Sequence, residues 1–167
     1  MSFSPVPLYL FRNLTDISPE FLGEIGVKLL MLDLDNTIAA YSEQSLAKSI
    51  ALWSERVVGC GVRLFIVSNN ARNKRVETFA KALSVGYAAG ASKPSPKVVL
   101  RTIEEFGFKQ DESALVGDQI FADALAANRA GIISIIVRPR RFTNPLLVIR
   151  YALEMPFRAM CGNKMFR

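Results

Sequence analysis

The residues best suited to chemistry in this chain are Asp33 and Asp35, which directly follow the largely apolar stretch 27–32. A short apolar stretch of this kind is typical of a strand buried on both faces of a sheet. The end of that strand would hold two carboxylates at the edge of the sheet. Because carboxylates this close repel each other, they require a cation or a shared proton. The pair therefore indicates a site for Mg²⁺ and phosphate chemistry.

Further polar side chains follow each later apolar segment, at the point where a strand would end. They are Ser68 and Asn69 after residues 63–67, Lys93 after 85–88, Asp118 after 114–116, and Asp123 five residues later. Because ligands of open parallel sheets bind beyond the carboxyl ends of the strands, we expect these side chains to meet on one rim. Carboxylates, a hydroxyl and an ammonium are the groups needed to transfer a phosphoryl group to a carboxylate.

The segments that must position these residues alternate between strands and helices. Strands are predicted to end at Asp33 and to span 63–67, 85–88, 114–116 and 132–137; helices are predicted at 18–26, 43–58, 71–83, 95–107 and 121–130. Right-handed crossovers between parallel strands then give an α/β fold. We expect a doubly wound, mostly parallel five-stranded sheet with helices on both faces.

Four motifs in this order resemble those of the haloacid dehalogenase superfamily of aspartyl phosphatases. They are DxDxT at residues 33–37, a strand-end serine at Ser68, Lys93, and GDxxxxD at residues 117–123. A single DxD pair is common by chance, but four motifs at successive strand ends are specific. The resemblance covers roughly residues 27–138, and it implies a HAD-like Rossmannoid fold and a phosphomonoester hydrolase.

The resemblance also implies a role for each acidic motif residue. Asp33 would be the nucleophile that forms an aspartyl-phosphate. Asp35 would be the general acid for the leaving alcohol and then the base for the attacking water. Mg²⁺ would be held by Asp33, the backbone carbonyl of Asp35 and Asp118, with Asp123 orienting the metal shell.

The remaining motif residues are implied to bind phosphate. Ser68, backbone amides near Asn69, and Lys93 would contact the phosphate oxygens, and Lys93 would also act in catalysis by neutralising charge. Taken singly, Ser68 and Asp118 could be helix caps, and Lys93 could be an exposed loop lysine. Asn70, Arg72, Lys74 and Arg75 could touch substrate, but a solvated helix end is the favoured interpretation.

Two other kinds of site fit the carboxylates less well. A calcium loop of the DxDxDG type requires glycine where this chain has Ile38. A receiver-like phospho-accepting signalling module shares the doubly wound sheet, an acid pair, a hydroxyl and a lysine. Its phosphorylated aspartate ends a later strand by itself, whereas residues 63–67 are followed here by Ser68.

The spacing of the motifs bears on the substrate. The gaps between Asp35 and Ser68, and between Ser68 and Lys93, each hold one helix, which leaves no room for a cap domain. These features resemble the capless subfamily IIIA, part of which dephosphorylates phosphatidylglycerophosphate. We therefore expect a lipid phosphate as substrate. A nucleic-acid end is the main alternative, followed by a phosphoprotein or a small metabolite.

The charge of the chain is concentrated at its C-terminal end. Residues 1–137 carry equal numbers of basic and acidic side chains, so residues 138–167 hold the whole net charge of +6. Arg150, Glu154 and Arg158 recur every four residues within an apolar stretch, while Pro156 should kink or break a helix there. This segment resembles a short interfacial element that could bind an anionic membrane, or a terminal helix that packs on the domain.

Composition limits the remaining possibilities. The 167 residues, half of them hydrophobic, predict one folded domain at 1–141 with a basic apolar appendage at 142–167. The absence of histidine excludes Ser-His-Asp triads and His-ligated zinc. We expect a cytoplasmic protein, because the chain has only two cysteines, an N-terminus without a basic signal-peptide region and no apolar run of about 18 residues. The basic apolar C-terminal segment could in addition place it peripherally on a membrane. No nucleic acid and no obligate protein partner are expected.

Overall fold

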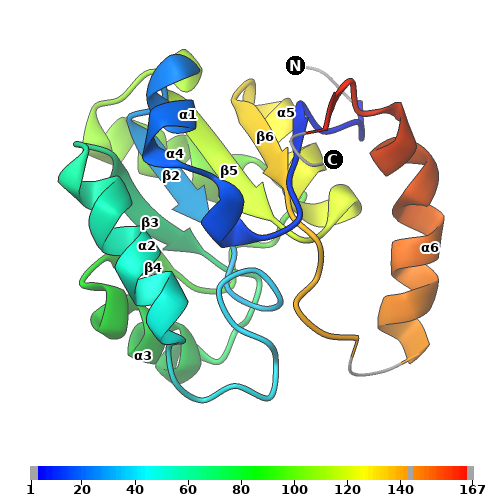
Figure 1. Cartoon of the computed structure of the whole chain (residues 1–167), viewed down its shortest axis with the longest axis horizontal. Coiled ribbons are helices and arrows are strands. Elements are labelled where there is room, and N and C mark those ends of the chain that lie inside the picture. The colour runs from blue at the N-terminus through cyan, green and yellow to red at the C-terminus, as the bar shows by residue number, and fades with distance from the viewer. Residues whose placement is uncertain (1–3, 143–144, 165–167) are drawn as a thin grey trace.

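A parallel β-sheet forms the centre of the molecule (Figure 1). The computed structural model describes residues 4–142 and 145–164. The strand order is β4-β3-β2-β5-β6-β1-β7. The five central strands are β2 (Leu29–Leu32), β3 (Arg63–Val67), β4 (Gly86–Ala88), β5 (Ser113–Gly117) and β6 (Ile133–Ile136). All strand pairs are parallel, which confirms the predicted doubly wound sheet.

Two further strands extend the sheet beyond the predicted five. They are β1 (Tyr9–Leu10) and β7 (Asn163–Lys164), each of two residues. Tyr9 pairs with Ile135 of β6 on one side and with Asn163 on the other. The prediction of five strands is therefore wrong in number. A two-residue strand has no alternating pattern to detect, and these two form only because the fold brings both chain ends to the edge of the sheet.

Helices cover both faces of the sheet. They are α1 (Pro19–Glu24), α2 (Lys48–Gly59), α3 (Asn73–Leu83), α4 (Lys97–Phe106), α5 (Leu125–Ala130) and α6 (Pro145–Met160), with short turns at Leu14–Asp16, Gln110–Glu112 and Ile120–Ala124. The helix predicted from residue 43 begins five residues later. Glu43 instead caps a loop, because its carboxylate accepts a hydrogen bond from the Ala40 amide.

The strand β2 shows why the sheet has two cores. Leu30 and Leu32 face one core together with side chains of α1, α2 and α3. Leu29 and Met31 face the other core together with side chains of α4 and α5. Because successive side chains of a strand point to opposite faces, all four residues are buried. This double burial confirms the interpretation of the apolar stretch before Asp33.

The connections at the carboxyl edge of the sheet are short. In the part of the chain that the structure describes, a loop and α2 join β2 to β3, and α3 joins β3 to β4. Neither connection forms a cap domain. The helix α6 runs along the periphery, on the opposite side of the molecule from α2 (Figure 1), and it is not broken at Pro156. None of the described helices is both long and apolar enough to cross a membrane.

Candidate functional site

The strand ends bring the predicted residues to one edge of the sheet. In the register of the sheet, Leu32 lies beside Ile66 of β3 and Val116 of β5. The next residue, Asp33, donates its backbone N–H to the Val116 carbonyl at 2.8 Å. Residues that directly follow β2, β3 and β5 are therefore neighbours, as expected for strands that run in parallel.

Lys93 forms the centre of a buried charged cluster. Its Nζ lies 2.7 Å from Asp33 Oδ1 and 2.7 Å from Asp123 Oδ1, and it donates to the Val67 carbonyl at 2.7 Å. Carboxylate oxygens of Asp33, Asp118 and Asp123 all lie within 4.8 Å of one another. The structure thus brings together a lysine and three aspartates from three separate segments of the chain.

The negative charge of this cluster exceeds its positive charge. Burial raises the pKa of Asp33 to about 7, since the neighbouring Asp123 partly offsets the opposing effect of Lys93. Burial, together with Asp33 and Asp123, raises the pKa of Asp118 well above its usual value. Burial alone would lower the pKa of Lys93, but the charges of Asp123 and Asp33 outweigh it and raise that pKa. Another cation would stabilise the carboxylate forms.

The arrangement of the three carboxylates fits a divalent metal ion. Asp118 Oδ1 is buried and has no hydrogen-bond partner among the described residues. Carboxylate oxygens are the ligands that Mg²⁺ prefers. Side chains of Asp33, Asp118 and Asp123 could therefore hold the ion. The Asp35 carboxylate lies outside this group, and only its backbone carbonyl was expected to act as a ligand.

The position of Asp123 depends on a glycine and on an irregular helical turn. Asp123 lies in the π-helical turn Ile120–Ala124, and its Oδ2 accepts a hydrogen bond from the Gln119 amide at 3.0 Å. A Cβ atom added at Gly117 would lie 2.1 Å from the Asp123 carboxyl group. Gly117 is therefore needed for the close approach of Asp123 to the end of β5.

The loop that carries Lys93 is fixed by Asn69. The Asn69 side chain donates Nδ2–H to the Lys93 carbonyl at 2.9 Å and accepts the Lys93 N–H at 2.7 Å. Ser68 is buried beside it, and its Oγ accepts the Asn70 N–H at 3.1 Å. The Asn69 side chain thus holds the loop that carries Lys93, whereas the phosphate contact predicted for the amides near Asn69 stays a prediction.

The carboxylate of Asp35 is held by two residues of the following segments. Asn70 donates Nδ2–H to Asp35 Oδ2 at 2.8 Å, and Arg75 of α3 donates Nε–H to Asp35 Oδ1 at 3.0 Å. Arg75 also donates to the carbonyls of Ala40 and Glu43. The solvated helix end that could account for Arg75 from the sequence is therefore wrong for this residue. Sequence spacing carries no signal for a contact across 40 residues.

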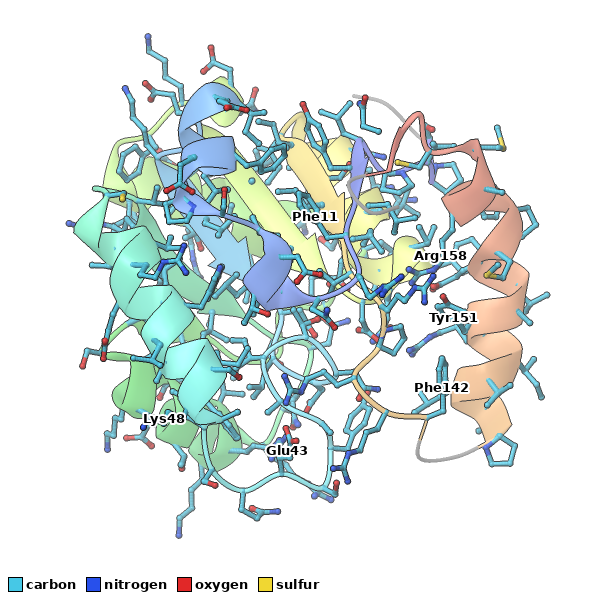
Figure 2. All side chains as sticks on the ribbon, viewed as in Figure 1. Phe11, Glu43, Lys48, Phe142, Tyr151 and Arg158 are labelled. Atoms are coloured by element: carbon cyan, nitrogen blue, oxygen red, sulfur yellow. The ribbon has the colours of Figure 1, made fainter. Side chains whose placement is uncertain are left out.

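The helix α6 reaches the site from outside the four motifs. Arg150 lies 3.4 Å from Asp118 Oδ2, and Arg158 donates to the carbonyls of Asp118 and Val137. Glu154 accepts the backbone N–H of Ile120 at 3.0 Å. Figure 2 shows that Arg158 points from α6 toward the body of the molecule. The four-residue spacing of these charges was visible in the sequence, but their inward direction was not.

Comparisons with known proteins indicate the family of the chain. A profile of haloacid dehalogenase-like hydrolases matches residues 55–137. A Bacillus subtilis (strain 168) protein named "Probable phosphatase YqeG" is 32% identical over 134 residues, which cover 80% of this chain and 77% of that protein. A glyceraldehyde 3-phosphate phosphatase of Methanopyrus kandleri is 28% identical over 67 residues, 40% of this chain and 29% of that protein.

Solved structures share the fold. A 3-deoxy-D-manno-octulosonate 8-phosphate phosphatase from Moraxella catarrhalis, in complex with magnesium, phosphate and KDO, superposes with a TM-score of 0.55 at 19% identity. The similarity covers 87% of this chain and 80% of that one. An uncharacterized protein from Listeria monocytogenes serotype 4b gives a TM-score of 0.56 at 18% identity, over 80% of this chain and 100% of that one.

Proposed function

Because the chain belongs to the haloacid dehalogenase-like hydrolase family and is a phosphatase, we propose that it forms and then hydrolyses an aspartyl-phosphate on Asp33. The observation that carries this proposal is the buried group of Asp33, Asp118 and Asp123 around Lys93. Lys93 pairs with Oδ1 of Asp33, so Oδ2 is the oxygen left to attack phosphorus. The hydroxyl of Thr37 lies 3.5 Å from that Oδ2 and can help to orient it.

The reaction would proceed in two displacements. In the first, Asp33 Oδ2 bonds to phosphorus while the ester P–O bond breaks, and Asp35 gives its proton to the departing alcohol oxygen. In the second, Asp35 takes a proton from water, whose oxygen attacks phosphorus. The bond between phosphorus and Asp33 then breaks, which releases inorganic phosphate and restores the carboxylate.

Charge neutralisation makes the first displacement possible. A phosphate dianion cannot approach a carboxylate unless nearby cations offset the repulsion. Lys93 supplies one cation, and Ser68 and the amides near Asn69 supply hydrogen-bond donors for the phosphate oxygens. Mg²⁺ bound by Asp33, Asp118 and the Asp35 carbonyl, with Asp123 beside it, would supply the second cation.

A rapid-quench experiment tests the covalent step. The protein is mixed with a phosphomonoester labelled with ³²P and Mg²⁺ and quenched in acid within milliseconds. We expect label on the protein that hydroxylamine removes, because hydroxylamine cleaves acyl phosphates. The Asp33→Asn variant should carry no label. Full turnover without any protein-bound label would refute the intermediate.

We further propose that the substrate is a lipid phosphate, such as phosphatidylglycerophosphate. Two features support a substrate embedded in a larger surface. The described connections around the site include no cap that would enclose a small metabolite. The helix α6 reaches Asp118 through Arg150 and exposes aliphatic side chains on its other side, so an apolar surface belongs to the same helix that contacts the site. Peripheral location on a membrane from the cytoplasmic side would follow from this substrate.

A substrate panel tests this proposal. It compares phosphatidylglycerophosphate in mixed micelles with a phosphopeptide, a 5′-phosphorylated oligonucleotide and a sugar phosphate, all with Mg²⁺. We expect the lipid to give the highest kcat/KM by about tenfold or more, because only it uses both the site and the apolar surface of α6. A higher value for any other substrate would reject the lipid assignment and identify the preferred class.

A further inference from the structure

The exposed surface of α6 is apolar along its whole length. Its exposed residues are Pro145, Leu146, Val148, Ile149, Ala152, Leu153, Met155, Pro156, Ala159 and Met160. The charged residues of the helix are Arg150, Glu154 and Arg158, and all three contact the body of the protein. An ordinary surface helix turns its apolar side to the core and its charged side to solvent, whereas α6 does the reverse.

Another surface helix of the same protein shows the ordinary pattern. The exposed residues of α4 are Lys97, Arg101, Glu104 and Glu105, all of them charged. Its apolar residues Val99 and Ile103 face the core. The reversal in α6 is thus a property of this helix and not of the protein's surface in general.

Four of the exposed residues form a continuous line, here named the outer stripe. Leu146, Ile149, Leu153 and Met160 follow the spacing of three, four and seven residues that places side chains on one side of a helix. Their exposed fractions are 75%, 56%, 63% and 66%. Large contiguous apolar patches on a soluble protein mark interaction sites. The outer stripe therefore needs an occupant.

The charge next to the outer stripe favours an anionic occupant. Arg138, Arg140 and Arg141 belong to the segment that leads from β6 into α6, and Arg138 and Arg141 are exposed there. In the sequence they precede Leu146, the first residue of the stripe, by five to eight residues. Arg150, at the same end of the helix, contacts Asp118 of the site. Basic side chains beside an apolar helix face are the pattern of elements that lie in the headgroup region of an anionic membrane.

We propose that the outer stripe of α6 inserts into the surface of an anionic phospholipid bilayer. The inference deepens the proposed function and rests on it, since a lipid phosphate is found at such a surface. A second protein chain fits less well, because specific protein interfaces combine apolar cores with hydrogen-bonding groups. The exposed side chains of α6 offer no hydrogen-bonding group apart from the thioethers of methionine.

The binding geometry would also keep the site next to the membrane-bound helix. The outer stripe faces away from the sheet, while the inner charges of the same helix hold the segment with Asp118. Inserting the stripe would therefore place α6 in the membrane surface, with the segment that carries Asp118 on the inner side of that helix.

Vesicle flotation of the full chain tests the proposal. The vesicles contain phosphatidylcholine alone or phosphatidylcholine with phosphatidylglycerol, and neither lipid is a phosphomonoester. We expect binding to the anionic vesicles, weakened by salt because the basic segment contributes. The variant Leu146→Gln/Ile149→Gln/Leu153→Gln should bind at least about tenfold more weakly, because three aliphatic side chains no longer enter the membrane.

A matched control separates this effect from general loss of surface hydrophobicity. Leu52 is 51% exposed and belongs to α2, a helix on the opposite side of the molecule from α6 (Figure 1), so Leu52→Gln should bind vesicles like the unchanged protein. All variants should hydrolyse p-nitrophenyl phosphate in solution at the same rate. Lack of that hydrolysis in the unchanged protein would count against the proposed function and not against the stripe.

Three results would overturn the inference. The first is equal vesicle binding by the triple variant and the unchanged protein. The second is no binding, or equal binding to neutral and anionic vesicles, by the unchanged protein. The third is a dimer in sedimentation experiments that the triple variant converts to a monomer, without any vesicle binding. That last result would assign the stripe to a second copy of the chain.

Discussion

The carboxyl edge of the sheet and the inner face of α6 both bury charged side chains, but they balance them differently. At the edge, Lys93 pairs with Asp33 and Asp123, Asp118 Oδ2 lies 3.4 Å from Arg150, and Asp118 Oδ1 lacks a hydrogen-bond partner in the described part of the chain. On α6, Glu154 and Arg158 pair at 3.2 Å and also bond to backbone groups of neighbouring segments.

The difference separates a binding site from an anchor. A buried cluster with excess charge is costly unless a ligand compensates it, so such a cluster is typical of a functional site. A buried pair of opposite charges whose members also bond to the backbone is balanced in charge, and it fixes the position of α6. A buried cluster whose charges are not neutralised by the protein thus indicates a ligand-binding site, whereas a neutralised pair indicates a structural contact.

The largest expected effect comes from removing the nucleophile at the edge. Asp33→Asn should lower kcat by about a thousandfold or more, because an amide oxygen does not form the phosphorylated intermediate. The fold should be retained, since the substitution removes a buried charge. Hydrolysis of p-nitrophenyl phosphate with Mg²⁺ measures the rate. Asp111→Asn, at an exposed acid, serves as the control, and activity of Asp33→Asn within tenfold of it would contradict the assignment.

The next effect concerns the anchor. Arg158→Leu should destabilise the protein by about 3 kcal/mol, because Glu154 keeps only the longer contact of 4.0 Å with Arg150 and two carbonyls lose their donor. Urea unfolding measures this change. The control Arg101→Leu breaks the exposed pair with Glu105 and should cost less than about 1 kcal/mol. Equal stability of the two variants would show that the buried charges do not anchor α6.

Arg75 provides a test of positioning within the edge. Arg75→Ala should lower kcat about tenfold or more with little change in KM, because Asp35 and the loop at residues 40–43 lose a shared donor. Arg75→Lys should recover only part of the rate, since lysine lacks the planar fork that reaches all three acceptors. Arg72→Ala changes an exposed arginine nearby and should have no effect. Full activity of Arg75→Ala would show that Arg75 is not needed to position Asp35.

The smallest effect concerns pH and metal. The raised pKa values of Asp33 and Asp118 mean that the metal-free fold favours their protonated forms. This contribution to stability is present in acid and is lost as pH rises through the folded pKa, about 7 for Asp33. In EDTA, Tm should therefore fall by a few degrees between pH 5.5 and pH 8.

Magnesium should reverse this trend, because it binds the ionised carboxylates. The increase in Tm on adding Mg²⁺ should be larger at pH 8 than at pH 5.5. In Asp118→Asn, both the loss of Tm with rising pH in EDTA and the response to Mg²⁺ should shrink. A Tm that rises from pH 5.5 to pH 8 without metal, equally in both proteins, would contradict the excess charge at the edge.

Much of the edge could be predicted from the sequence because parallel strands impose a simple rule. Once the apolar stretch before Asp33 is identified as a buried strand, the residue after it must lie at the carboxyl edge. The same rule applies to Ser68 and to Asp118, and the structure brings these strand ends together. Lys93 reaches Asp33 through a loop, yet its place in the motif order was sufficient to predict its location.

The contacts that the sequence did not predict all join distant segments through side chains. Arg75 binds Asp35 across 40 residues, and Asn69 binds the backbone of Lys93. Such contacts follow no period of a strand or a helix, so no local pattern encodes them. The two-residue strands at the chain ends escaped prediction for the same reason.

Local periodicity and strand direction are enough to predict the alternation of strands and helices, and with it the edge where Asp33, Lys93 and Asp118 gather. The direction in which α6 faces depends on contacts that exist only in the folded protein. A helix with one polar and one apolar side can turn either side to the protein. Which side it turns depends on the hydrogen-bonding groups of the surface that it packs against. Arg158 donates to the carbonyls of Asp118 and Val137, and Glu154 accepts the amide of Ile120. These hydrogen bonds hold the charged side of α6 against the protein, so its apolar side faces outward.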